Sequence, residues 1–529
     1  MNLYLKNKAL KISFGTTLSK LLGLLRQISI AATFGVGFAY DAFNYAYIIP
    51  GFLLIIVGGI NGPIHNAIVN ILTPINSPKA SIIIARLTLK LTLLLAAISI
   101  IIFLNANFFI EIIAPNLNSE TQFSAVNQLK ILCISIPLSG FIGLSFGALN
   151  TKNKFFISSI SPSIISLTII IFIFIRWIIT DKSSLDLNIF SEELIALATV
   201  MGTFLQFSVQ ARELYKIGLL RFKLDWRIGN EEEKRIIKLI FPASISSGLG
   251  QINVFVDMFF ASSIKGAASG LAYANFLIQA PLGILSSALI LPLLPKLSRL
   301  INKNSKEDLK KTLTIAIEFC LLSTFFLSGL FITFNQLIIE LIFQRGAFNL
   351  EAAQLVKNIL IAYAIGIPFY LLRDLLIRTY YAFERINLPF KLSILGILLN
   401  ITFDWILIGA PTNNYETLFN FNFGIFGIVL SSALVNFVSC IILYFKLNDK
   451  NINLPNFIIF KKFFLIAISC ILSCLSCSLI FQNLYQINSN FIIKLFIGLI
   501  GFLSYTLIYY LITKYFKVNN LNLNLKSFR

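Results

Sequence analysis

The stretch GLLRQISIAATFGVGFAYDAFNYAYIIPGFLL (residues 23–54) contains two apolar runs joined by a short turn. A later stretch, GQINVFVDMFFASSIKGAASGLAYANFLIQAPLGIL (residues 250–285), has the same plan. In both, a charged residue lies inside the first run, a glycine opens the turn, and a proline interrupts the second run. The landmarks pair as Arg26 with Asp257, Gly35 with Gly266 and Pro50 with Pro281, each pair 231 positions apart. A repeat at a constant offset indicates two halves with the same structure.

Apolar runs of this kind recur along the whole chain. Of 529 residues, 57% are hydrophobic and 12% are charged, whereas soluble proteins average about 25% charged residues. Because a helix needs about 20 apolar residues to cross a bilayer, the sequence predicts an all-α polytopic membrane protein with about 14 transmembrane helices. The expected spans are 11–34, 43–72, 82–106, 126–150, 156–179, 190–210, 235–260, 267–293, 312–336, 353–380, 387–410, 421–445, 460–481 and 491–513.

The repeat predicts how these helices are organised. Six helices in each copy is an even number, so both copies enter the membrane from the same side, as a parallel repeat. The expected parts are an N-terminal lobe of helices 1–6 (1–211), a basic cytoplasmic linker (212–238), a C-terminal lobe of helices 7–12 (239–450), and helices 13–14 with a cytoplasmic tail (451–529).

The charge distribution indicates orientation rather than a nucleic-acid partner. The net charge is +20, and most Lys and Arg residues fall in the termini and in alternate connections. Cytoplasmic loops of membrane proteins collect such residues, so both termini are expected in the cytoplasm. The N-terminus lacks a signal-peptide cleavage site, and the first span is therefore expected to be retained. Cys474 and Cys477 form a C-x-x-C inside an apolar helix, where a metal or redox role is not favoured.

Ionisable residues inside membrane spans are costly and usually mark a function. The first span contains Lys20 and Arg26, and Asp41 lies just past its outer end. Cations in mid-membrane suit an anionic head group, because Arg and Lys bind phosphate. The alternative for Lys20 is that its long side chain reaches the inner membrane surface.

The second half contains acids instead. Asp257 lies in the helix equivalent to that of Arg26, and Asn400 and Asp404 share one face of a later helix through their i, i+4 spacing. Such oxygen ligands suit a hard cation such as Na⁺, or a proton relay. The alternative is that each aspartate is neutral or paired with a cation such as Arg373. Opposite charges in the two halves favour a coupled transporter.

Other classes of function find less support. The chain contains no G-x-x-x-x-G-K loop, no H-E-x-x-H and no histidine-based acid–base set, since His65 is its one histidine. An enzyme is therefore not expected. A non-transporting scaffold would leave the mid-membrane charges unexplained.

Taken together, these motifs resemble the MurJ (MviN) lipid II flippases of the multidrug/oligosaccharidyl-lipid/polysaccharide exporter superfamily. The resemblance spans nearly the whole chain in the family's order, and the segment 58–68 is similar to a cyanobacterial variant. The matching segments are LSKLLGLLRQ (18–27), FGVGFAYDAF (34–43), YIIPGFLL (47–54), SGLAYANFLIQAPLGIL (269–285), LPLLPKLSRL (291–300), FQRGAFNLEA (343–352) and IAYAIGIPFYLLRDLLIRTYYAF (361–383).

The resemblance implies export of lipid II, the undecaprenyl-diphosphate-linked peptidoglycan precursor, from the inner to the outer leaflet of the bacterial plasma (inner) membrane. The two lobes would alternate access to a central cavity, coupled to an ion or to the membrane potential. Membrane lipids and the cell-wall synthesis machinery are the expected partners, and no cofactor is expected beyond Na⁺ as the candidate coupling ion. The implied substrate-binding residues are Lys20, Arg26, Asp41 and Ser269. The implied Na⁺ ligands are Asp257, Asn400, Asp404 and Ser432, with a backbone carbonyl near Ile428.

Three positions depart from the family pattern. Leu54 and Phe276 occupy positions where many members have an arginine, and Lys20 replaces a more usual arginine. Either Lys20 and Arg26 hold the diphosphate with fewer partners, or the substrate differs. A flippase for another lipid-linked oligosaccharide, or a multidrug exporter of the same superfamily, is the alternative.

Overall fold

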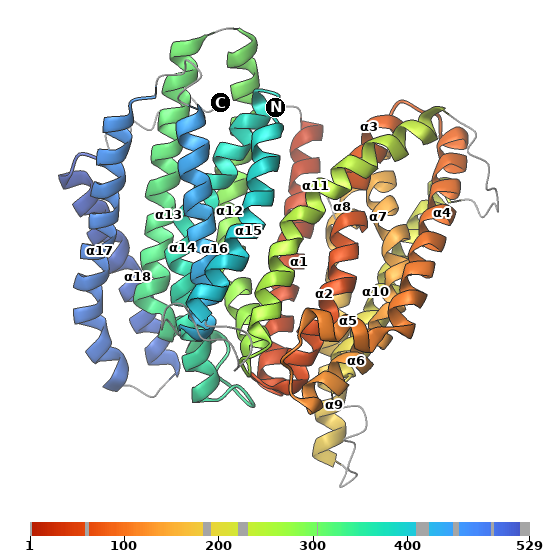
Figure 1. Cartoon of the computed structure of the whole chain (residues 1–529), viewed down its shortest axis with the longest axis horizontal. Helices are drawn as coiled ribbons and strands as arrows, with labels where there is room; N and C mark the ends of the chain where they lie inside the picture. The colour runs from red at the N-terminus through yellow and green to blue at the C-terminus, as the bar shows by residue number, and fades with distance from the viewer. Residues whose placement is uncertain are drawn as a thin grey trace. The chain divides into compact units, whose positions relative to one another are not determined.

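The computed structural model describes residues 3–58, 63–182, 192–220, 231–303, 305–408, 423–447, 454–487 and 491–518. Over these residues the chain is built from helices, with no strand (Figure 1). This confirms the predicted all-α class. The helices pack into two compact units, of which unit 1 comprises residues 1–269 and 346–348 and unit 2 comprises residues 270–345 and 349–529.

Unit 1 contains the first eleven helices of the described chain. They are α1 (Leu3–Phe34), α2 (Phe38–Gly58), α3 (Pro63–Leu72), α4 (Ser77–Leu104), α5 (Ala106–Ile113), α6 (Ser119–Cys133), α7 (Ser135–Thr151), α8 (Phe155–Ile160), α9 (Ser163–Lys182), α10 (Leu194–Lys216) and α11 (Glu231–Ala261). Unit 2 contains most of α12 (Ala267–Asn302), with α13 (Lys306–Ile342), α14 (Leu350–Ala382), α15 (Asn387–Ile408), α16 (Gly424–Leu447), α17 (Asn456–Ile487) and α18 (Phe491–Tyr515).

Many of these helices are suited to crossing a membrane. Within the described ranges, 10 helices are long and apolar enough, or 11 when the bent pair α6–α7 counts as one span. Three other helices, α1, α9 and α11, cover the remaining predicted spans. The apolar part of α9 is short, at Ser163–Ile179, and α1 and α11 contain several charged residues. The protein is thus a multi-pass membrane protein.

The landmarks of the internal repeat occupy equivalent places in the structure. Gly35 and Gly266 lie in the turns after α1 and α11, with φ of 57° and 78°. This left-handed region is readily adopted only by glycine. Pro50 and Pro281 lie inside α2 and α12, the helices that follow these turns. Units defined by packing and lobes defined by a repeat are different divisions of a chain, so the predicted lobe boundaries stay a prediction.

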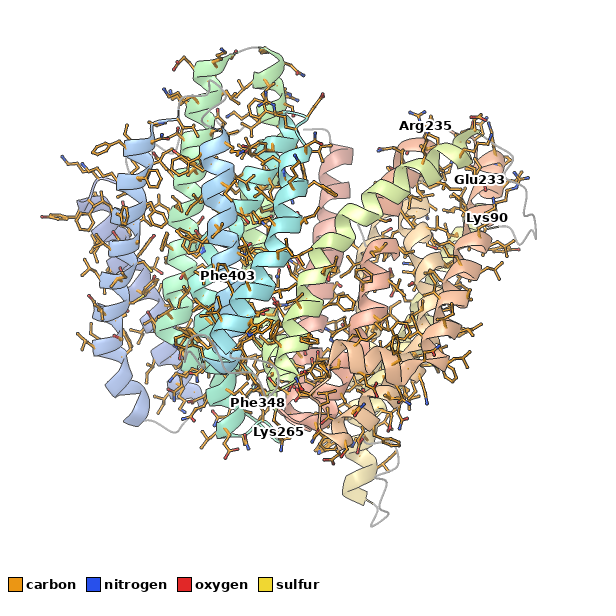
Figure 2. All side chains as sticks on the ribbon, in the orientation of Figure 1. Lys90, Glu233, Arg235, Lys265, Phe348 and Phe403 are labelled. Atoms are coloured by element: carbon orange, nitrogen blue, oxygen red, sulfur yellow. The ribbon has the colours of Figure 1, made fainter. Side chains whose placement is uncertain are left out.

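Within unit 1, α11 runs obliquely along α2 and α3 (Figure 1). Its N-terminal turn is held to α4 by ion pairs. Glu232 pairs with Lys79 at 2.7 Å, and this hydrogen bond lowers the pKa of the Glu232 carboxyl. The fully buried Glu233 pairs with Lys90 (Figure 2) and lies 4.0 Å from Arg86. Acids in the first turn also suit the positive end of the helix dipole.

Within unit 2, α14 packs along α16 and α13. Small residues allow this close approach, since a Cβ at Gly366 would lie 3.0 Å from the Cβ of Ala433. Farther along α13 the helix is kinked at Phe334, where φ is −108° and ψ is 19°. Phe334 packs into a cluster with Cys477, Phe481 and Tyr505 of α17 and α18. The kink therefore lies where α17 and α18 pack against α13.

Candidate functional site

The predicted cations of α1, Lys20 and Arg26, lie in unit 1. Lys20 is exposed and Arg26 is partly buried. The Nε atom of Arg26 is buried and makes no hydrogen bond within the described part of the chain. No ion pair forms between either side chain and a described acid. A guanidinium in an apolar span attracts an anion, and a phosphate can accept two parallel hydrogen bonds from it.

Asp41 and Ser269 are brought together, and they bind each other. The buried Asp41 carboxylate, near the start of α2, accepts hydrogen bonds from the Gly266 N–H at 2.7 Å and the Ser269 N–H at 2.8 Å. It also accepts one from the Ser269 hydroxyl at 2.5 Å. The first N–H groups of a helix have no partner inside the helix. Asp41 therefore caps the N-terminus of α12 from a different helix, and the substrate-binding role of Asp41 and Ser269 stays a prediction.

A second contact joins the loop between α13 and α14 to the end of α1. The Ala347 N–H, in the loop between α13 and α14, donates to the Ala32 carbonyl at 2.8 Å. Gly346 has a φ of 58°, and a Cβ there would lie 2.2 Å from the Ala32 oxygen. A Cβ at Gly35 would lie 2.4 Å from the Ala347 oxygen. Two glycines thus allow backbone to meet backbone at the C-terminal end of α1.

In unit 2 the predicted oxygen ligands Asn400 and Asp404 of α15 are buried and adjacent. The Asn400 side-chain N–H donates to Asp404 Oδ2 at 3.2 Å. Two hydroxyls of α16 donate to Asn400 Oδ1, from Ser431 at 3.3 Å and from Ser432 at 3.4 Å. The shared helix face predicted from the i, i+4 spacing is confirmed, and Ser432 lies beside it; the role of these residues as Na⁺ ligands stays a prediction. Ser431 was missed by sequence reasoning, because hydropathy does not tell which of two consecutive serines faces α15.

The chemistry of this cluster fits a hard monovalent cation. It offers one carboxylate together with amide and hydroxyl oxygens, which are the ligands that hard cations prefer. The described residues contain no group of three His, Cys, Asp or Glu side chains that could hold a metal ion. Asp257 lies on α11 in unit 1, so its joining this cluster stays a prediction, as does the carbonyl near Ile428.

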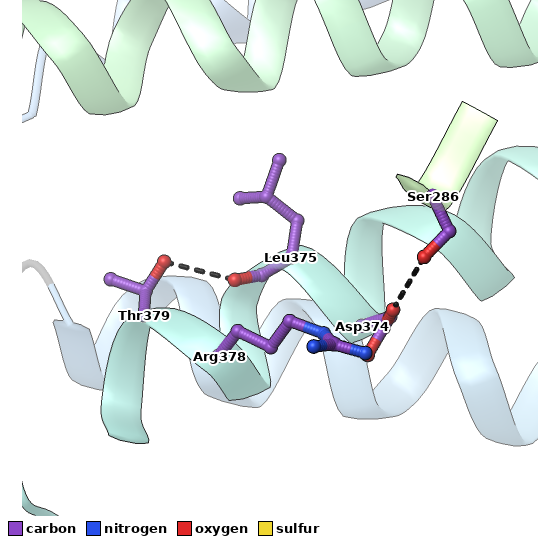
Figure 3. A network of polar contacts seen from close by, with 5 residues as sticks. All are labelled: Ser286, Asp374, Leu375, Arg378 and Thr379. Atoms are coloured by element: carbon purple, nitrogen blue, oxygen red, sulfur yellow. Dashed lines mark hydrogen bonds and ion pairs between the residues drawn. The ribbon is translucent and has the colours of Figure 1, made fainter. Parts of the chain in front are cut away.

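Arg373 does not pair with Asp404 or with its neighbour Asp374. Its Nη1 donates to Asn436 Oδ1 of α16 at 3.0 Å. Asp374 instead pairs with Arg378 at 3.0 Å and accepts a hydrogen bond from Ser286 of α12 at 3.4 Å (Figure 3). Sequence reasoning missed this network, although an acid four residues before an arginine on one helix was a usable signal.

Comparisons with known proteins match this chain to one family. The family model described as lipid II flippase MurJ matches residues 30–514. The probable lipid II flippase MurJ of Synechocystis sp. is 36% identical over 448 residues, which is 84% of this chain and 82% of that protein. Its counterpart from Buchnera aphidicola subsp. Schizaphis graminum is 28% identical over 96% of both chains.

Two solved structures show the fold. A lipid II flippase MurJ in an inward closed conformation superposes with a TM-score of 0.75 at 24% identity, covering 94% of this chain and 98% of that one. An inward-facing multidrug transporter of the MATE family, in the MOP superfamily, gives a TM-score of 0.66 at 13% identity over 83% of this chain and 97% of that one. From the family match and the Synechocystis relative, the chain belongs to the lipid II flippase MurJ family.

Proposed function

We propose that this protein transports lipid II from the inner to the outer leaflet of the bacterial plasma membrane, for cell-wall synthesis. Its relatives are named lipid II flippases. The observation that carries the proposal is Arg26, an arginine in an apolar helix whose buried Nε finds no acceptor within the described chain. A diphosphate supplies the anion that this site lacks. Lys20 provides a second cation on the same helix.

Transport proceeds by alternating access across fourteen membrane-spanning helices, with both termini in the cytoplasm. The Asp41–Ser269 and Ala347–Ala32 hydrogen bonds lie on the side predicted to face outward. They keep that side closed, and they must break for the cargo to leave. Asp41 and Ser269 are then free to contact the substrate, which reconciles their predicted role with the closure.

Na⁺ binding by the predicted ligands Asp257, Asn400, Asp404 and Ser432 drives the cycle. Support comes from the oxygen-rich chemistry of the cluster and from the rule that intramembrane acids mark ion pathways. H⁺ and the membrane potential are the alternative drivers. The cell-wall synthesis machinery that uses lipid II is the expected partner.

Rescue of a bacterium depleted of its own lipid II flippase tests the proposal. We expect this protein to restore growth and normal cell shape when it is produced in the membrane. Failure to rescue at normal membrane levels would contradict transport of lipid II.

The second candidate is a flippase for another lipid-linked oligosaccharide, or a multidrug exporter. It is favoured by Leu54 and Phe276, which stand where the family resemblance leads us to expect arginines. The same strain distinguishes the candidates. Resistance to cationic drugs, or export of a different lipid-linked saccharide, without rescue of lipid II transport would favour the second.

A further inference from the structure

A partly open cavity of about 290 Å³ lies in unit 2, between α13, α14, α17 and α18. It borders the kink of α13 at Phe334, and its apolar wall includes Leu337, Phe481 and Ile497. Ligand pockets are typically lined by apolar side chains with a few polar groups that fix the ligand. This pocket has that composition and is open on one side, so a molecule from its surroundings can enter it.

The cavity holds one cation and no acid. Lys357 of α14 lines it, and none of the other described lining residues is an aspartate or a glutamate. Lys357 forms no ion pair within the described chain, whereas the nearby acid Glu340 is bound by Lys494 at 2.8 Å and by Gln336 at 2.8 Å. The remaining polar lining groups include the amides of Asn335 and Gln336. The cavity thus complements an anion attached to an apolar body.

The cavity borders the surface that faces the membrane. Leu475 both lines the cavity and is 55% exposed, and Leu479 and Phe496, on the outer faces of α17 and α18, are exposed as well. Lys357 lies seven residues into α14 and Phe334 eight residues before the end of α13. At 1.5 Å per residue both are about 10–12 Å from the connecting loop. In the predicted orientation this depth lies in the outer leaflet, so the neighbouring molecules are membrane lipids.

We propose that this cavity binds an anionic phospholipid of the outer leaflet, with its phosphate on Lys357 and part of one acyl chain along Leu337, Phe481 and Ile497. The lipid is a resident component of unit 2 rather than the cargo. It fills the space that the kink of α13 opens, and it holds α17 and α18 against α13. This inference does not depend on which lipid-linked saccharide the protein transports.

Binding of defined lipids to the purified full-length protein tests the proposal. Phosphatidylglycerol and phosphatidylcholine with the same acyl chains are titrated in mixed micelles, and binding is followed by native mass spectrometry and by the midpoint of thermal unfolding. We expect phosphatidylglycerol to bind more tightly than phosphatidylcholine. Lys357→Gln should weaken phosphatidylglycerol binding about tenfold, as loss of a charged hydrogen bond does. Lys357→Arg should preserve the preference, and glycerol 3-phosphate alone should not stabilise the protein.

Two matched variants separate the site from its surroundings. Lys494→Gln removes a lysine that is paired with Glu340 and does not line the cavity, so it should leave the lipid preference unchanged. Ser478→Phe places a ring at the cavity wall and should abolish phosphatidylglycerol binding with Lys357 intact. Equal binding by Lys357→Gln and the unaltered protein would overturn the proposal. So would equal affinity for the two lipids, or a Ser478→Phe variant that keeps the preference, because the cavity would then be a packing void only.

Discussion

Two charged side chains of unit 1 differ in whether the fold supplies their hydrogen-bond partners. Asp41 receives three hydrogen bonds from Gly266 and Ser269, and the cost of burying its carboxylate is offset within the fold. Arg26 has a buried Nε with no such partner in the described chain. The first arrangement stabilises one conformation, and the second leaves a cation ready for a ligand. Lys20 and Arg26 are therefore the better candidates for direct substrate contact.

Replacing Arg26 by alanine should strongly reduce transport and leave folding intact. A hydrogen bond to a charged group contributes about 1.5–3 kcal/mol, so we expect a loss of roughly 10- to 150-fold in transport rate. Rescue of a flippase-depleted strain and the amount of protein in the membrane are measured together. Arg26→Lys should retain part of the activity because it keeps the charge but loses the bidentate geometry. Lys130→Ala, which removes a cation outside the span of Arg26, serves as the control. Unchanged rescue by Arg26→Ala would refute the role of Arg26 in binding the substrate.

Asp404→Asn should remove stabilisation by Na⁺. The cluster of Asn400, Asp404 and Ser432 contains a single carboxylate, and without its charge the oxygens bind a cation far more weakly. The measurement compares the midpoint of thermal unfolding in NaCl and in KCl at equal ionic strength. Ser431→Ala tests whether the serine missed by sequence reasoning takes part. If Na⁺ and K⁺ act alike on the unaltered protein, this is not a Na⁺ site.

Sequence reasoning predicted the site residues whose role depends on local spacing. Asn400 and Asp404 share a face because one turn of helix separates them. It did not predict what Asp41 binds, because the Gly266 and Ser269 N–H groups lie more than 220 positions away. A backbone donor gives no signal in a sequence, so such a contact emerges only from the packing of α2 against the start of α12.

At the scale of single elements, the N-terminal turn of α11 depends on one buried acid. Glu233→Gln should destabilise unit 1 by about 3 kcal/mol, because it leaves two cations, Lys90 and Arg86, without their carboxylate. Lys90 keeps 22% exposure, which places the effect at the lower end of the range for buried pairs. Hydrogen exchange of the first α11 amides and the thermal midpoint give the measurement.

The neighbouring acid provides the control. Glu231 is 88% exposed, and within the described residues its ion pair is with Lys234 of the same helix, so Glu231→Gln should leave stability unchanged. The paired change Glu233→Leu with Lys90→Met should recover much of the loss, since apolar residues of similar volume often replace a buried ion pair without cost. Equal destabilisation by Glu231→Gln and Glu233→Gln would show that the buried pair is not the cause.

The loop between α13 and α14 should detach when a methyl group is added at Gly346. The new Cβ would lie 2.2 Å from the Ala32 oxygen, so either the loop or α1 must move. Gly346→Ala should therefore speed hydrogen exchange at the Ala347 amide. Gly218→Ala is a matched control, because Gly218 also has a positive φ of 72° but has no atom within 4 Å of an added Cβ. It should cost only the strain of a left-handed residue, about 1–2 kcal/mol. Similar exchange at Ala347 in both variants would contradict the closure.

At the scale of the whole molecule, hydropathy predicted the helices well and their breaks poorly. The predicted span 126–150 is two helices, α6 and α7, bent by 46°. Two hydroxyl groups bind backbone carbonyls at this bend: the Ser135 hydroxyl donates to the Leu132 carbonyl, and the Ser99 hydroxyl donates to the Cys133 carbonyl. Hydroxyls that bind backbone carbonyls compete with the helix. An apolar average does not register this competition, and the second hydroxyl comes from α4.

The same limitation applies to the kink of α13. The predicted span 312–336 continues in the structure to Ile342, with a break at Phe334 and no proline there. Phe334 is drawn toward Phe481 and Tyr505 of helices that follow more than 140 positions later. The break thus lies where α13 packs against α17 and α18, and it borders the cavity that Lys357 lines. The sequence around Phe334 does not predict the break, because the residues that Phe334 packs against belong to other spans.

The orientation of all these helices follows from where the cations lie, and labelling tests it directly. Ala347 is exposed in the loop between α13 and α14, and Lys303 is exposed at the opposite end of α13. Each position is changed to cysteine in a protein that lacks the six native cysteines. A membrane-impermeant maleimide added to intact cells should then react differently with the two variants. Ala347→Cys should react at once, and Lys303→Cys only after the membrane is opened, because cytoplasmic connections collect Lys and Arg. The opposite pattern would mean that the protein has the opposite orientation in the membrane. The Asp41–Ser269 hydrogen bonds would then lie on the cytoplasmic side, where they would control the loading of cargo rather than its release.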